Sequence, residues 1–183
     1  MRVITGSAKG RRLMAPRGME TRPTSDRIKE ALFNIIGSRI IDINFLDLYA
    51  GTGAIGIEAI SRGAKKAVFI EKSPQAVKII RENLKLTGLP DQAEIMAYDA
   101  DRALEILKSE GFTFDIVFID PPYRKELVKT SLEKLEYCKL IGPGGLVIAE
   151  SSKIDVLPDE VDHLKRFRQE KYGDTVLTFY QDQ

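Results

Sequence analysis

The fold of this chain is decided by the stretch FLDLYAGTGAIG, residues 45–56. Its first part, Phe45 to Tyr49, reads as a buried strand, and the glycines after it mark a tight turn before a helical stretch at 54–63. The same alternation continues along the chain. Strand-like runs at Ala67–Ile70, Ala93–Ala97, Ile116–Ile119 and Leu146–Ala149 are separated by helical stretches at 74–87, 100–110 and 125–138. This order predicts a mostly parallel α/β sheet with right-handed crossovers.

The C-terminal end departs from the alternation. Two strand-like runs, Arg166–Tyr172 and Thr175–Tyr180, flank Gly173-Asp174, a two-residue loop typical of a tight hairpin. The last strand should therefore run antiparallel to its neighbours. A mostly parallel sheet with this antiparallel ending resembles the Rossmann-like, seven-stranded sheet found in methyltransferases.

The N-terminal part is predicted to form a separate small extension. Short strands at Arg2–Thr5 and Arg11–Ala15 surround a glycine turn, which indicates a β-hairpin. Thr24 is predicted to cap a helix running to about Gly37, with an apolar face at helical spacing. We therefore expect two units, an N-terminal extension at 1–39 and an α/β domain at 40–183.

Composition limits the class of protein. The 183 residues contain one Cys and one His, so neither a disulfide nor a structural zinc cluster is expected, and no metal ligands are predicted. The N-terminus lacks a long apolar segment, which predicts neither a secretory signal nor a membrane span. We expect a cytoplasmic monomer.

The net charge of +1 conceals an asymmetry. Residues 1–39 contain nine Lys and Arg against three acids, which leaves +6 there and −5 in the rest of the chain. Basic side chains among turn-forming glycines suit phosphate contacts, although a solvated charged face is the ordinary alternative. The candidate RNA-binding residues are Lys9, Arg11, Arg12, Arg22 and Arg27.

The glycine turn alone does not identify a cofactor. Gly51 to Gly56 satisfies the pattern G-x-G-x-x-G, which places a pyrophosphate at a helix N-terminus in dinucleotide-binding proteins. Glu71 ends the second strand twenty residues after Gly51, where an acid can accept ribose hydroxyls of either NAD or S-adenosylmethionine. The motif therefore predicts a nucleoside cofactor of either kind.

Acids at four successive strand ends favour S-adenosylmethionine. Asp47, Glu71, Asp99 and Asp120 each lie at or just after a predicted strand. Carboxylates in such positions suit a ligand that carries a sulfonium and an ammonium, and they disfavour a diphosphate. Asp99 has an equally simple explanation as the cap of the following helix.

The chemistry is predicted from Asp120-Pro121-Pro122-Tyr123, which follows a buried strand. An exocyclic amino group is a poor nucleophile until its N–H bonds are drawn toward acceptors. Asp120 and the Pro121 carbonyl would supply these acceptors, and Tyr123 would stack on the ring and hold the nitrogen in line with an electrophile. An ordinary strand-to-loop turn is the alternative for this tetrad taken alone.

Together these motifs resemble the bacterial RsmD family of 16S ribosomal RNA guanine-N2 methyltransferases. The resemblance rests on residues 22–34, RPTSDRIKEALFN, on residues 47–53, on Glu71 and on the tetrad at 120–123, and it covers nearly the whole chain. It implies methyl transfer from S-adenosylmethionine to a guanine 2-amino group in small-subunit RNA. The cofactor residues that it implies are Asp47, Tyr49, Gly51, Thr52, Gly53, Glu71, Lys72, Asp99, Ala100 and Asp120.

Other functions remain open at this point. A nicotinamide-dependent oxidoreductase would explain the glycine motif and Glu71, but not the tetrad or the antiparallel ending. An adenine-N6 or protein-glutamine methyltransferase would share the chemistry. A non-catalytic RNA-binding protein would account for the basic N-terminus alone.

Overall fold

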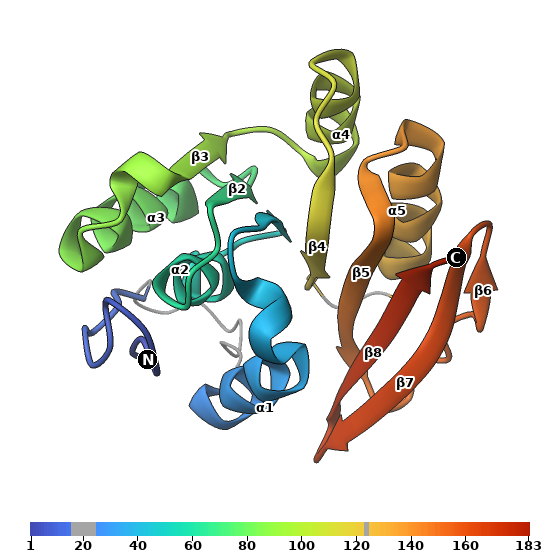
Figure 1. Ribbon diagram of the computed structural model, residues 1–183, viewed down its shortest axis with the longest axis horizontal. Helices are drawn as coiled ribbons and strands as arrows, with labels where there is room; N and C mark the ends of the chain where they lie inside the picture. The colour runs from blue at the N-terminus through green and yellow to red at the C-terminus, as the bar shows by residue number, and fades with distance from the viewer. Residues whose placement is uncertain (16–24, 123–124) are drawn as a thin grey trace.

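The computed structural model describes residues 1–15, 25–122 and 125–183. Its centre is an eight-stranded sheet with the order β3-β2-β1-β4-β5-β8-β7-β6 (Figure 1). The parallel part consists of β1 (Asn44–Leu48), β2 (Lys66–Ile70), β3 (Ala93–Met96), β4 (Phe114–Ile119) and β5 (Ile141–Ser152). The predicted parallel α/β sheet is confirmed.

The C-terminal hairpin also forms as predicted. Strands β7 (Leu164–Tyr172) and β8 (Thr175–Asp182) pair antiparallel around Gly173, and β8 inserts antiparallel beside β5. The sheet has one strand more than the seven expected, because the two-residue strand β6 (Glu160–Val161) pairs with β7 at the edge.

Helices cover both faces of the sheet. Successive strand residues point to opposite faces, so Phe45 lies in one core with helices α1 (Asp26–Ile36), α2 (Ala54–Ser61) and α3 (Pro74–Thr87). Leu46 lies in the other core with α4 (Ala100–Ser109) and α5 (Lys125–Cys138). Short 3-10 turns, η1 (Gly37–Ile40) and η2 (Pro90–Gln92), precede β1 and β3. The result is a three-layer sandwich.

The two arms of the N-terminal segment pair antiparallel, as the predicted hairpin requires, but the pairing is short. Val3 N donates to the carbonyl of Arg11 at 3.0 Å, and Gly10 N donates to that of Val3 at 2.9 Å. One isolated bridge joins Arg2 and Arg12, and no strand forms on either side among residues 1–15. The reason lies in α2, since the N–H groups of Ile4 and Thr5 donate to the Glu58 carboxylate at 2.8 and 3.0 Å and that of Ala8 donates to Ser61 Oγ at 3.0 Å. These N–H groups lie beyond the short antiparallel pairing and dock the segment on α2.

The beginning of α1 differs by one residue from the prediction. Ser25 is the N-cap, and its hydroxyl accepts a hydrogen bond from Ile28 N, whereas Thr24 lies outside the described residues. The buried face of α1 includes Ile28, Leu32 and Ile36, as its apolar spacing predicted.

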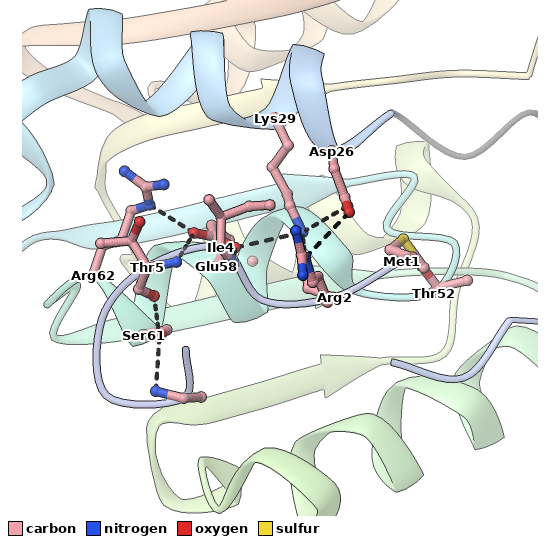
Figure 2. Close-up of polar contacts among 12 residues, drawn as sticks. Met1, Arg2, Ile4, Thr5, Asp26, Lys29, Thr52, Glu58, Ser61 and Arg62 are labelled. Carbon is pink, nitrogen blue, oxygen red and sulfur yellow. Dashed lines mark hydrogen bonds and ion pairs between the residues drawn. The ribbon is translucent and has the colours of Figure 1, made fainter. Parts of the chain in front are cut away.

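Helix α1 also contributes a buried cation. Lys29 is fully buried, and its Nζ donates to the carbonyl of Arg2 at 2.5 Å and lies 3.4 Å from Glu58 Oε2 (Figure 2). Arg62 donates to the other oxygen of Glu58 at 2.7 Å. Asp26, which faces Lys29, pairs also with Arg2. This network, centred on Glu58, joins the N-terminal segment, α1 and α2.

None of the helices within the described ranges combines the length and apolar character needed to cross a membrane.

Replacing Glu58 tests the Glu58 network. Glu58→Ala leaves Lys29 as a buried charge with a weakened set of partners and frees the N–H groups of Ile4 and Thr5. We expect a loss of about 3–5 kcal/mol in the free energy of unfolding, measured by urea denaturation. Glu82→Ala, which removes the exposed pair with Lys85, is the control and should change little. Equal losses in the two variants would contradict this account.

Candidate active site

The carboxyl ends of the central strands meet at one edge of the sheet. After β1, Ala50 N donates to the carbonyl of Ile70 at the end of β2 at 2.9 Å, and after β4, Asp120 N donates to that of Leu48 at 3.4 Å. The turns that follow β1, β2 and β4 therefore lie side by side. This edge is where open α/β sheets bind their ligands.

The glycine loop between β1 and α2 is held by Asp47. Gly53 adopts a left-handed conformation with φ of 75°, and α2 begins at the next residue. Gly56 N in the first turn of α2 donates to Asp47 Oδ2 at 2.8 Å. A Cβ at Gly56 would lie 2.3 Å from the ring of Phe69, so only glycine allows this approach of helix to strand. Asp47 thus positions the helix N-terminus from within the core.

Glu71 ties the same loop to the end of β2. Its two carboxylate oxygens accept hydrogen bonds from Gly51 N at 2.9 Å and from Ser73 N at 2.8 Å. Each oxygen retains a further lone pair, which a ribose hydroxyl can donate to. Thr52 lies between the two loop glycines, and Lys72, next to Glu71, is exposed.

Tyr49 connects the loop to the opposite core. It has a positive φ of 66°, which is rare for a residue other than glycine, and it directly follows β1. Its hydroxyl lies 2.9 Å from Ser131 Oγ on α5. Burial raises the pKa of the Tyr49 phenol, and the hydrogen bond with Ser131 opposes this shift.

The alternative explanation of Asp99 matches its contacts. Asp99 is the N-cap of α4, its Oδ1 accepts a hydrogen bond from Arg102 N at 3.0 Å, and Ala100 is the first residue of the helix. Asp99 is also exposed, at the loop that follows β3. It therefore lies at the carboxyl edge of the sheet but further out than Asp47.

Two carboxyl groups at this edge, those of Asp47 and Asp120, have raised pKa values. Burial raises the pKa of Asp47 to about 8, against the hydrogen bond from Gly56, and the Glu71 carboxylate adds to the increase. Burial also raises the pKa of Asp120 well above its usual range, and the charges of Glu150 and Asp47 raise it further. Removal from water disfavours the charged form of each group. A cation bound here would lower both pKa values.

Glu150 was not among the predicted residues. It lies on β5, one position beyond Ala149, which pairs with Ile119, so it is the neighbour of Asp120 across the two strands. The predicted strand Leu146–Ala149 ends directly before Glu150, so the strand-end rule that selected the other acids also applies to it. Applying the rule to the fifth strand would have found it.

The remaining predicted residues are those of the tetrad and the candidate RNA contacts. Pro121 is buried and Pro122 exposed directly after Asp120, while Tyr123 lies outside the described residues. Arg22 also lies outside them. The other candidate RNA contacts are exposed, with Lys9, Arg11 and Arg12 in the N-terminal segment and Arg27 on α1.

The residues at this edge fit a cationic nucleoside. The carboxyl groups of Asp47 and Asp120 gain their charge most readily beside a cation, and Glu71 offers oxygens to a ribose. The fold adds the antiparallel strand β8 to a parallel sheet, an ending that a dinucleotide-binding domain does not require. The fold and site together define a Rossmann-like methyltransferase, a class of enzyme whose methyl donor is S-adenosylmethionine.

Comparison with known proteins identifies the family. The profile of the family described as "Conserved hypothetical protein 95" matches residues 1–181. The chain is 32% identical to Ribosomal RNA small subunit methyltransferase D of Escherichia coli strain K12, over 99% of this chain and 89% of that protein. It is 38% identical to YlbH of Bacillus subtilis, over 98% of each chain. The chain belongs to the family of ribosomal RNA small subunit methyltransferase D, as the sequence resemblance predicted.

Solved structures agree with this assignment. The Escherichia coli protein yhhF superimposes with a TM-score of 0.87 at 33% identity, over 100% of this chain and 98% of that one. An O-methyltransferase from Bacillus cereus, in complex with S-adenosylhomocysteine, shares the fold with a TM-score of 0.68 at 18% identity, over 86% of this chain and 82% of that one.

The raised pKa of Asp47 predicts how stability depends on pH. Because the folded protein keeps a proton that the unfolded chain releases, the free energy of unfolding should fall as pH rises from about 4 to about 8. Each such proton contributes a slope of at most about 1.4 kcal/mol per pH unit. Asp47→Asn should lose one proton's share of this slope, measured by urea denaturation across that range. An unchanged slope would show that Asp47 is ionised in the folded protein.

The same groups should couple cofactor binding to proton release. A sulfonium beside these carboxyls lowers their pKa values, so binding of S-adenosylmethionine should release protons and tighten as pH rises toward 8. Calorimetry in buffers of different ionisation enthalpy measures the protons released. S-adenosylhomocysteine, whose sulfur is neutral, should release fewer; equal release by both ligands would contradict this account.

Proposed function

We propose that this protein transfers a methyl group from S-adenosylmethionine to the exocyclic 2-amino group of a guanine in 16S ribosomal RNA. The observation that carries this proposal is Asp120, a carboxylate with a raised pKa directly before two prolines, at the edge where β1 and β4 end. Membership of a family of small-subunit ribosomal RNA methyltransferases supports RNA as the substrate.

The proposed cofactor site is built around the glycine loop. Gly51, Thr52 and Gly53 form the turn beneath the ligand, with Asp47 and Tyr49 fixing its two flanks. Glu71 accepts the ribose hydroxyls, with Lys72 beside it, and Asp99 and Ala100 lie on the side proposed for the adenine. S-adenosylmethionine supplies an electrophilic methyl group on a sulfonium.

Asp120 and the tetrad prepare the nucleophile. The Asp120 carboxylate and the Pro121 carbonyl accept hydrogen bonds from the two N–H groups of the guanine 2-amino group. These two hydrogen bonds orient the nitrogen lone pair toward the methyl carbon. Tyr123 stacks on the base. As the N–C bond forms and the S–C bond breaks, the nitrogen becomes acidic, and Asp120 takes up the proton that it loses. Positioning and electrostatics therefore supply the catalysis.

The electrostatics of the site favour this role for Asp120. Burial and the neighbouring charges raise the pKa of Asp120, which disfavours the carboxylate form that accepts hydrogen bonds and a proton. A sulfonium bound beside Asp120 would lower this pKa and favour the carboxylate. Asp120 is therefore a better acceptor when the methyl donor is in place.

The basic N-terminal unit, residues 1–39, is proposed to hold the RNA backbone while residues 40–183 carry out the reaction. Lys9, Arg11 and Arg12 are exposed on the segment docked over α2, and Arg27 is exposed on α1. Arg22 joins them in the sequence. We propose that the enzyme acts in the cytoplasm as a monomer on a small-subunit particle, whose shape supplies specificity beyond the phosphate contacts.

Replacing Asp120 tests the reaction. Asp120→Ala should lower kcat by about 10²–10⁴-fold, because it removes both the orienting acceptor and the proton acceptor. The measurement is transfer of labelled methyl from S-adenosylmethionine to small-subunit particles, followed by nucleoside analysis for N2-methylguanosine. Asp115→Asn, at the opposite end of β4, keeps an acceptor for Asn44 N and should retain activity. Label in protein or DNA, with none in RNA, would overturn the ribosomal substrate.

Removing the basic side chains tests whether the N-terminal segment binds RNA. Alanine at Lys9, Arg11 and Arg12 together should weaken RNA binding and lower the slope of log K against log salt by about 1 for each phosphate that the variant no longer neutralises. Filter binding over a range of salt concentrations measures this slope. Lys171→Ala, an exposed lysine on β7, is the control. A slope unchanged by the triple substitution would place the RNA elsewhere.

A further inference from the structure

Asn83 connects two segments that the proposed function uses for different ligands. It lies on the buried face of α3 with Ile80 and Leu84 and is fully buried. Its Oδ1 accepts a hydrogen bond from Met14 N at 2.7 Å, and its Nδ2 donates to Met14 O at 3.1 Å and to Thr52 O at 2.9 Å. One side chain thus holds the N-terminal segment and the glycine loop.

Both N–H bonds of the amide and its oxygen are used in this bridge. The two bonds to Met14 resemble a rung between strands, so they fix the direction as well as the position of the chain there. Met14 follows Leu13, the last buried residue before residue 16, and the chain continues toward Arg17 and Arg22. Asn83 therefore fixes the position and direction of the N-terminal segment at Met14.

At the other end, Asn83 controls the orientation of a peptide group in the glycine loop. The carbonyl of Thr52 and the N–H of Gly53 belong to one planar peptide unit. Gly53 N donates to Ala50 O at 2.7 Å, so the unit is held at both of its polar atoms. Figure 2 shows that Met1 also reaches Thr52, with its sulfur 3.9 Å from the hydroxyl.

We propose that Asn83 is a positioning residue that couples RNA binding on the N-terminal segment to cofactor binding on the glycine loop. The inference rests on the proposed function, which assigns RNA to the first segment and S-adenosylmethionine to the second. A ligand that holds Met14 also holds Asn83 and, through it, the Thr52–Gly53 peptide, so the second ligand has less backbone to order. By linkage, each ligand strengthens binding of the other by the same factor.

A purely structural role for Asn83 is the alternative, and Ser61 provides a matched control for it. Ser61 is also buried, and its hydroxyl accepts from Ala8 N at 3.0 Å and donates to Thr5 O at 2.6 Å. It anchors the same N-terminal segment at the last residue of α2, away from the glycine loop. Loss of either side chain should lower stability, but only loss of Asn83 should uncouple the two ligands.

The test compares Asn83→Ala and Ser61→Ala with the wild type in binding alone. The dissociation constant of labelled S-adenosylhomocysteine, which carries no methyl to transfer, is measured by equilibrium dialysis with and without small-subunit particles. We expect the particles to tighten binding about tenfold in the wild type and in Ser61→Ala, and to leave it unchanged in Asn83→Ala. Hydrogen exchange at residues 51–54 should slow on addition of particles in the first two proteins only.

Asn83→Asp gives a second variant in case the alanine variant does not fold. It keeps an acceptor for Met14 N and removes the donors to Met14 O and Thr52 O. Tenfold coupling retained in a folded Asn83 variant, or absent from the wild type although both ligands bind, would overturn the inference and leave the proposed function standing. Failure of the wild type to bind particles at all would instead overturn the proposed function.

Discussion

Helix α2 is buried at every one of its residues, and the glycine loop depends on this burial. A helix this short is not stable alone, so its stability depends on packing against its neighbours. The sheet covers one side, and the N-terminal segment covers another, where a Cβ on Gly6 would lie 1.6 Å from the carbonyl of Ser61. Such close contact brings backbone N–H groups out of water. Glu58 and Ser61 satisfy them from within α2 itself.

This arrangement buries the Glu58 carboxylate, and two cations compensate its charge. Lys29 and Arg62 pair with Glu58, which ties α1 to α2. Burial lowers the pKa of the Lys29 ammonium. The nearby charges of Glu58 and Asp26 oppose that shift and so favour the charged form of Lys29. The N-terminus of α2, with its glycine loop, is therefore held from the side remote from the ligand.

Local sequence patterns predicted the elements, because each depends on neighbours in the chain. The helices at 74–87 and 125–138 have the predicted bounds, since their apolar spacing and flanking residues define them. The two arms of the N-terminal hairpin pair as predicted, but the pairing is short because the N–H groups of Ile4 and Thr5 donate to a side chain more than fifty residues away, on α2. Strand-end acids were predicted by position. Their burial and raised pKa values, and the pairing of Glu150 beside Asp120, depend on how the strands assemble. The role of Asn83 has one signal in the sequence, which is a polar residue on the apolar face of a helix.

In the absence of a ligand, burial of the acids at the carboxyl edge lowers the stability of the folded protein. This effect on stability explains why the acids suit a cationic ligand. Two carboxyl groups with raised pKa values are stabilised little by their surroundings, since the hydrogen bond from Gly56 only partly offsets the burial of Asp47. A site built for stability would place a lysine or arginine among them. In the proposed mechanism the positively charged methyl donor takes the place of such a side chain. The acids then gain an opposite charge only when the donor binds, so this attraction contributes to binding and not to folding. When the methyl leaves, the sulfur becomes neutral and this attraction is lost. The electrostatics that favour binding of the donor therefore also favour release of the product.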